Sequence, residues 1–151
     1  GYASVISSKS NPIELGKAEV IREGKDVAII SLGSMAPMAM EAAELLAKKK
    51  ISALVADARF IKPLDSELIK RIAHNIKNIV TIEEGVSEGG FGSAVLEFIE
   101  RENLKGVKVK RICLPDKFIE HGKHSELFLK YNLTPEAVCD VIVSELLNSN
   151  Q

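Results

Sequence analysis

Three things are scarce in this sequence: cysteine, net charge and long apolar runs. The two cysteines, Cys113 and Cys139, each lie in an apolar pattern, which favours two reduced, buried thiols over a disulfide or a metal site. The 20 basic and 21 acidic side chains give a formal net charge of −1. That balance gives no electrostatic reason to expect a nucleic-acid partner, and the basic cluster of a protein bound to anionic membranes is also missing.

No apolar run approaches the roughly 20 residues that a helix needs to cross a bilayer. Residues 1–11 are rich in serine and lack the apolar stretch of a signal peptide. We therefore expect a cytoplasmic protein without a membrane partner. The 151 residues, 46% hydrophobic and 27% charged, suit one globular domain. Residues 1–12 show no periodicity and are interpreted as a linker or arm before a single domain at 13–151, in either a natural short protein or an excised fragment.

The apolar pattern alternates between short continuous runs and longer amphipathic segments. Continuous runs bounded by turn signals are typical of strands buried in a sheet, and a period near 3.6 is typical of helices. The turn signal at residues 23–26 suggests a hairpin that places the first strand antiparallel at a sheet edge. The pattern predicts an α/β three-layer sandwich: about five strands, mostly parallel with one antiparallel edge strand, and helices on both faces. Strands are predicted at 18–22, 27–32, 51–58, 78–82 and 107–114, and helices at 35–49, 66–74, 91–102, 125–130 and 135–147.

Local signals support several helix boundaries. Asp65 is placed to cap the second helix, and Thr134 with Pro135 to begin the last one. In the first helix one predicted stripe consists of Met38, Ala42, Leu45 and Lys49, with Leu46 beside it.

Ligands of open parallel sheets usually bind beyond the carboxyl ends of the strands. The strongest feature there is the glycine-rich stretch 83–93, which matches neither a P-loop nor the Rossmann pattern. Its carboxylates would repel a phosphate, although they could hold a cation. Close packing or a subunit interface explains the glycines better. The candidate interface residues are Glu83, Glu84, Gly89, Gly90, Phe91, Gly92 and His121.

Other chemical groupings are weak. Glu83 and Glu84 are adjacent at a strand end, so their side chains should point to opposite faces, which is poor geometry for a catalytic pair. A metal site of Cys113, His121 and His124 matches no standard zinc spacing, and a surface or interface role suits His121 better. Arg59 follows a strand and could bind an anion, but a structural pair with a nearby carboxylate, Asp57 or Asp65, is favoured. We predict no catalytic, cofactor-binding or metal-binding residue in this chain.

Several segments together resemble the C-terminal domain of transketolase-type enzymes, in the form found in the 1-deoxy-D-xylulose-5-phosphate synthase family. These are residues 16–28, residues 32–46, the loop 58–65 (Ala-Arg-Phe-Ile-Lys-Pro-Leu-Asp) and the glycine-rich stretch 83–95. The most discriminating segment is Leu-Pro-Asp-Lys-Phe-Ile-Glu-His-Gly at 114–122. The resemblance covers residues 13–147, and its motifs are specific jointly rather than singly.

The resemblance implies a parent transferase that uses thiamine diphosphate and Mg²⁺ to condense pyruvate with glyceraldehyde 3-phosphate, feeding isoprenoid, thiamine and pyridoxal synthesis. In that family the cofactor and the metal are held by the N-terminal and middle domains, whose motifs are absent here. The resemblance therefore implies a structural, dimerising domain that binds no cofactor, packs against those domains in a homodimer, and is inactive alone. Two alternatives stay open: the C-terminal part of a transketolase or 2-oxoacid dehydrogenase β subunit, and an independent small-molecule binding module.

Overall fold

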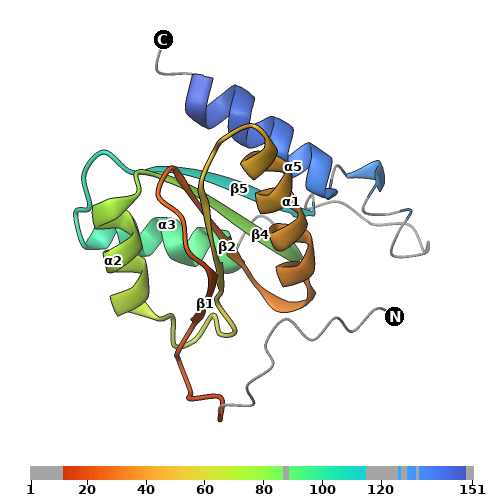
Figure 1. Cartoon of the computed structure of the whole chain (residues 1–151). Helices are drawn as coiled ribbons and strands as arrows, with labels where there is room; N and C mark the ends of the chain where they lie inside the picture. The colour runs from red at the N-terminus through yellow and green to blue at the C-terminus, as the bar shows by residue number, and fades with distance from the viewer. Residues whose placement is uncertain (1–11, 87–88, 115–125, 127–128, 132, 149–151) are drawn as a thin grey trace.

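The computed structural model describes residues 12–86, 89–114, 126, 129–131 and 133–148. Within these residues the core of the fold is a five-stranded sheet with the order β1-β3-β2-β4-β5 (Figure 1). Strand β1 pairs antiparallel with β3, and every other neighbouring pair is parallel. The mostly parallel sheet with one antiparallel edge strand is therefore confirmed. The strands are β1 (Glu19–Arg22), β2 (Val27–Ser31), β3 (Ala53–Asp57), β4 (Asn78–Val86) and β5 (Lys108–Leu114).

The predicted hairpin between the first two strands is wrong, because β3 lies between β1 and β2. The turn after β1 instead crosses the start of β3. The backbone amides of Lys25 and Asp26 both donate to Ser52 O, and the Ser52 amide donates to Asp26 Oδ2. Gly24 lies so close to this strand that a Cβ would stand 2.1 Å from the carbonyl carbon of Ala53. A local turn signal cannot reveal this crossing, because its partner lies 26 residues further along the chain.

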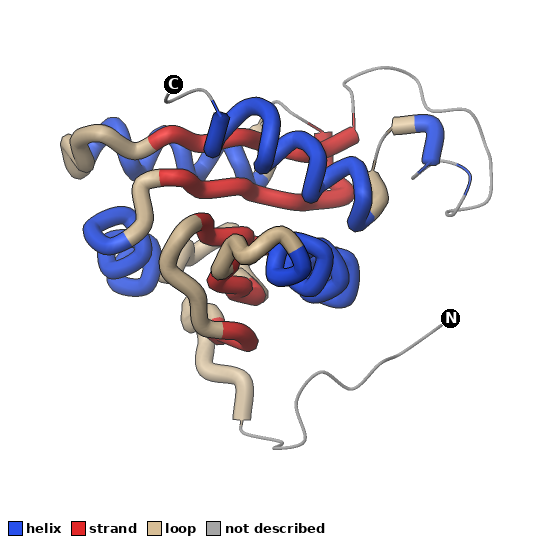
Figure 2. Tube along the Cα trace, turned by 45° about the horizontal axis from the view of Figure 1, so that its top comes forward, coloured by secondary structure: helices blue, strands red, loops and turns tan. Residues whose placement is uncertain are grey.

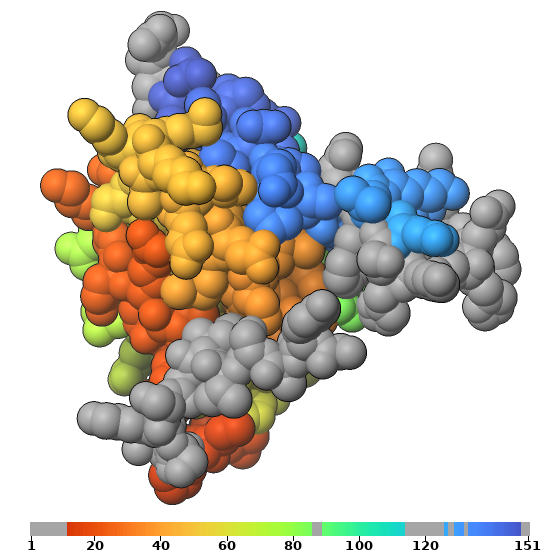
Figure 3. Space-filling view, turned by 45° about the vertical axis from the view of Figure 1, so that its right-hand side comes forward, coloured from red at the N-terminus to blue at the C-terminus, as the bar shows by residue number. Residues whose placement is uncertain are grey.

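Helices cover both faces of the sheet (Figure 2). One core cluster joins the sheet to α1 and to the C-terminal helix, and the other joins it to α2 and α3. Figure 3 shows α1 and the C-terminal helix side by side on the outer surface. The three-layer sandwich is confirmed. The helices are η1 (Gly33–Met35), α1 (Ala36–Lys48), α2 (Ser66–Asn75), α3 (Phe91–Arg101) and α5 (Pro135–Val141), which continues as η2 (Ile142–Leu147).

The predicted caps are present. Asp65 Oδ1 accepts a hydrogen bond from the Leu68 amide, and Thr134 Oγ1 accepts one from the Ala137 amide. The buried stripe of α1 differs from the prediction, because Met38 and Leu45 are only partly buried. The helix lies against both the sheet and α5, so its buried face is wider and consists of small side chains with one leucine. The buried residues of α1 are Ala36, Ala39, Ala42, Ala43 and Leu46.

Strand β4 is longer than predicted and includes the carboxylates at its end. The prediction ended this strand at Ile82, but pairing with β5 resumes after a register shift, at Val86 opposite Leu114. As a result Glu83, Glu84 and Gly85 belong to the strand. Of the predicted helix at 125–130, the described residues 126, 129 and 130 are helical. The described helices include none that is both long enough and apolar enough to cross a membrane.

Candidate functional site

The winding of the sheet reverses between β2 and β4. After β2 the chain passes through α1 on one face to β3, and after β4 it passes through α3 on the other face to β5. Such a reversal leaves a crevice at the carboxyl ends of the two strands, where open α/β sheets usually bind ligands. A cavity of about 170 Å³ lies there. It is lined by Leu32, Gly33, Ser34, Ile61, Glu83, Glu84, Gly85, Gly90 and Phe91.

Glu83 is the buried charge of this site. Only 3% of the residue is exposed, and its Oε2 accepts a hydrogen bond of 3.0 Å from the Gly92 amide at the start of α3. Burial raises the pKa of the Glu83 carboxyl, against the amide hydrogen bonds of Gly92 and Phe91 and the charge of Arg111, which lower it. A carboxylate at a helix N-terminus is favourably placed, so Glu83 fixes the start of α3 against β4.

Glu84 contacts a different element, as the alternation of a strand predicts. Its Oε1 accepts a hydrogen bond from Ser34 Oγ in the short helix η1, which also lines the cavity. The two glutamates thus bind two different elements, η1 and the start of α3, while both line the same cavity. Ser34 is a site residue that the sequence analysis did not identify, because its partner Glu84 lies 50 residues away in the sequence.

The glycines of the stretch serve different purposes. A Cβ on Gly92 would stand 2.7 Å from Thr81 Oγ1 and 2.8 Å from Arg111 Cγ, so this glycine allows α3 to pack closely on the sheet. Gly89 has φ of +69°, a conformation that L residues rarely adopt. Gly90 caps α3 with φ of −86°, which any residue can adopt. Gly92 therefore confirms internal close packing, whereas the interface stays a prediction.

The remaining candidate interface residues differ in access. Phe91 is fully buried in the core, so its side chain can influence an interface only by positioning its neighbours. Gly89 is exposed, and Gly90 and Glu84 are partly buried. His121 and His124 lie outside the described residues.

Arg59 pairs with a carboxylate, but with neither predicted partner. Its guanidinium binds Glu19 of β1, while its backbone amide donates to Asp57 Oδ1 at 3.1 Å. Glu19 stands opposite Asp57 in the antiparallel register, which brings its side chain next to Arg59. Asp65 is unavailable because its two oxygens accept from the Leu68 and Ala18 amides. This correction again depends on β1 lying beside β3.

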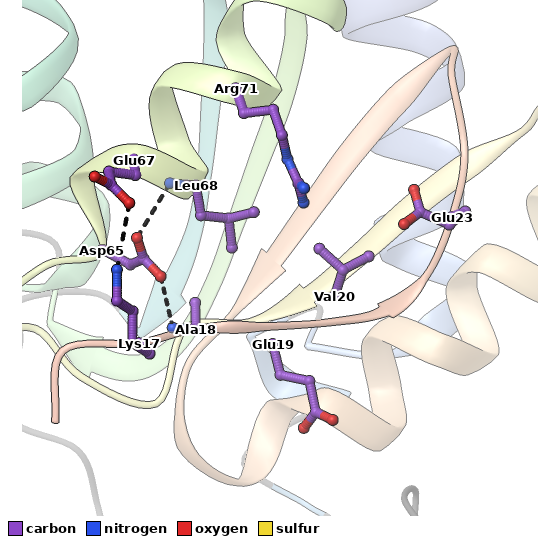
Figure 4. A pocket seen from close by; sticks show the side chains of 9 residues that line it. All are labelled: Lys17, Ala18, Glu19, Val20, Glu23, Asp65, Glu67, Leu68 and Arg71. Atoms are coloured by element: carbon purple, nitrogen blue, oxygen red, sulfur yellow. Dashed lines mark hydrogen bonds and ion pairs between the residues drawn. The ribbon is translucent and has the colours of Figure 1, made fainter. Parts of the chain in front are cut away.

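A larger cavity, of about 600 Å³, lies between β1 and α2. Most of its charged groups bind within the chain: Lys17 pairs with Glu67, and Asp65 binds the Ala18 amide and caps α2 (Figure 4). Arg71 points from α2 into the hollow, and Glu23 lies on its far side. These contacts attach the segment that leads into β1 to the start of α2, and we interpret the hollow as structural.

The lining of the cavity at β2 and β4 is a poor match for thiamine diphosphate. It presents the carboxylates of Glu83 and Glu84 and, among the residues that the structure describes, no lysine or arginine, so these walls would repel a diphosphate. The described residues hold no group of three His, Cys, Asp or Glu side chains placed to bind a metal ion. Cys113 and Cys139 are free, and burial raises the pKa of both thiols, which keeps them protonated at neutral pH.

The fold itself is that of a transketolase C-terminal domain. A solved structure described as a split-gene transketolase, an inactive β4 tetramer, superposes with a TM-score of 0.86 and 36% identity, over 94% of this chain and 46% of that one. Transketolase from Campylobacter jejuni shares the fold at a TM-score of 0.60 and 16% identity, over 86% of this chain and 19% of that one.

The sequence comparison gives the family directly. The model for the transketolase C-terminal domain matches residues 16–138, and the chain belongs to that family. A 1-deoxy-D-xylulose-5-phosphate synthase of Halothermothrix orenii is 44% identical over 93% of this chain and 22% of its own length. A synthase of Symbiobacterium thermophilum is 47% identical over 84% of this chain and 19% of its own length. The chain thus spans about a fifth of the curated relatives that it matches.

Proposed function

We propose that this chain is the C-terminal domain of a 1-deoxy-D-xylulose-5-phosphate synthase, a thiamine-diphosphate-dependent transferase that condenses pyruvate with glyceraldehyde 3-phosphate. The observation that carries the proposal is identity of 43–47% to synthases over 82–93% of the chain. Thiamine diphosphate and Mg²⁺ belong to the other domains of such a parent enzyme. The isolated chain is inactive under this proposal, and the parent works in the cytoplasm in isoprenoid, thiamine and pyridoxal synthesis.

Within the parent the domain supports assembly. Its carboxyl edge, with Glu83, Glu84, Gly89, Gly90 and Gly92, faces a neighbouring domain or the partner subunit of a homodimer, and the buried Phe91 holds this edge in place. His121, outside the described residues, stays a predicted member of the same interface. Support comes from a cavity whose carboxylates are unsuited to phosphorylated substrates. Such a surface is better suited to contact with another domain or subunit than to catalysis.

The mass of the native polypeptide tests the parent enzyme. The 140 residues aligned with the Halothermothrix synthase make up 22% of that protein, which is therefore about four times as long as this chain. An antibody to the domain should detect a band at about four times 16.4 kDa in extract of the source cells. A band at about twice this mass would indicate a split transketolase or a β subunit, and a band at 16.4 kDa an independent binding module.

Replacement of Gly90 by leucine in the parent enzyme tests the interface. The backbone of Gly90 (φ −86°, ψ −169°) accepts any residue, so the change reports space around the cap rather than strain. We expect weaker association in sedimentation velocity, with thermal unfolding of the isolated domain little changed. The matched control is Glu44→Leu. Glu44 lies on the exposed face of α1, so this change should leave assembly unaltered. An unchanged dimer in the Gly90→Leu enzyme would exclude this edge as the interface.

A further inference from the structure

The cavity between β2 and β4 is too small for most ligands and has two chemically different parts. Small-molecule sites usually enclose about 300–1,000 Å³, whereas this one holds about 170 Å³. A cavity of about 150 Å³ holds one benzene molecule. The space at the carboxyl edge is therefore sufficient for a single side chain.

Its walls select the kind of side chain. Leu32, Ile61 and Phe91 provide an apolar lining, while Glu83 and Glu84 provide carboxylates. Lysine and arginine combine an apolar stem with a cationic head, and they bury the stem along apolar surface. Among the described residues that line the cavity, none is basic. Both parts of the cavity are therefore complementary to a basic side chain, with an apolar stem against the apolar wall and a cationic head near the carboxylates.

The electrostatics of Glu83 agree with this geometry. Its carboxylate is nearly fully buried, and burial outweighs the opposing influence of the Gly92 and Phe91 amides and of Arg111. A buried charge is costly unless it is well paired. A second carboxylate, Glu84, lines the same cavity and has Ser34 as its neutral partner. An incoming cation would compensate a negative potential that the described groups leave in place.

We propose that this cavity receives a lysine or arginine side chain of a neighbouring polypeptide in the assembled parent enzyme, as the central anchor of the interface. This inference rests on the proposed assembly function and names the chemistry of its partner. Small, desolvated pockets that take up one basic or aromatic side chain dominate the energy of many interfaces. The charge pairing gives the contact its specificity, and the apolar walls exclude water from it.

The first test titrates this chain with n-butylguanidinium and, as the neutral control, with n-butanol, followed by amide NMR. We expect the amide signals of Gly33, Ser34 and Gly85 to shift with the cation and not with the alcohol. The shifts should be lost in Glu84→Gln, which keeps the size of the side chain and removes its charge. Absent shifts, or equal shifts with both probes, would overturn the inference.

The second test compares Glu84→Gln with Glu97→Gln in the parent enzyme by sedimentation velocity at two salt concentrations. Glu97 is exposed on α3 and outside the cavity, so it is the matched control. We expect about tenfold weaker association for Glu84→Gln, a smaller salt dependence than in the wild type, and less than twofold change for Glu97→Gln. If Gly90→Leu weakens association but Glu84→Gln does not, the interface stands and the anchor is wrong. If neither variant weakens association, the proposed interface is wrong as well.

Discussion

Gly92 offers the sharpest test of how α3 packs on the sheet. In Gly92→Ala the new Cβ would stand 2.7 Å from Thr81 Oγ1, 2.8 Å from Arg111 Cγ and 2.9 Å from Arg111 Cδ. Overpacking of this kind costs about 1–3 kcal/mol. Alanine recovers less than about 1 kcal/mol of helix propensity, because the site lies in the first turn. We expect a net loss of about 1–2 kcal/mol in the free energy of unfolding, measured by urea denaturation of this chain.

The matched experiment is a double-mutant cycle with Thr81→Ala, which removes one of the three close atoms. The cost of Gly92→Ala should fall by about 1 kcal/mol in the Thr81→Ala background, because residues in contact couple by this amount. Ser93→Ala, one position along and only partly buried, serves as the control and should show no such coupling to Thr81. A Gly92→Ala protein as stable as the wild type would refute the packing argument. Equal costs in both backgrounds would show that Arg111 alone sets the limit.

Three further predictions concern buried polar groups. Thr81 is 1% exposed and its hydroxyl has no hydrogen-bond partner within the described part of the chain, so Thr81→Val should raise the free energy of unfolding by about 1 kcal/mol in urea denaturation. Asp65→Ala should lower it by about 2 kcal/mol because the Leu68 and Ala18 amides both lose their acceptor, whereas Asp65→Asn should lose less than half as much. The raised pKa of Glu83 means that the folded state binds its proton first, so the stability of the wild type relative to Glu83→Gln should increase as the pH falls from 7 towards the ordinary value of 4.5. A difference that decreases over this pH range would contradict the burial argument.

Local sequence patterns were sufficient to predict the helices and strands, but not to predict which strands pair with one another. Residues 27–31 form a central strand because every position is apolar or small. All five residues are buried, since helices cover both faces of the sheet. Asp65 and Thr134 could be identified as caps because a cap depends on a hydrogen bond only three residues away. The strand that pairs with β1 could not be predicted in this way, because the pairing depends on where the chain places β3 in the sheet after α1. Arg59 shows the consequence: its ion pair with Glu19 exists only because β1 lies beside β3.

The candidate site also has some features that the sequence predicts and others that only the fold creates. The glycine-rich stretch could be found from sequence, and so could its unsuitability for phosphate, since both follow from residue types. The burial of Glu83 could not, because β4 continues past Ile82 only through its pairing with β5. The hydrogen bond from Ser34 to Glu84 could not be predicted either, because the two residues lie 50 positions apart in the sequence. The cavity is thus created by two strand ends that only the topology brings together.

The same topology explains why a sheet of this type can serve assembly instead of catalysis. The reversal between β2 and β4 opens a crevice whatever the sequence, and the side chains at the strand ends decide its use. Dinucleotide and phosphate sites leave the helix N-terminus free for an anion. Here the amide of Gly92 is already occupied by Glu83, a carboxylate of the chain itself. With that donor used internally and a second carboxylate beside it, the crevice has lost its affinity for anions and is suited to a basic group of a neighbouring polypeptide.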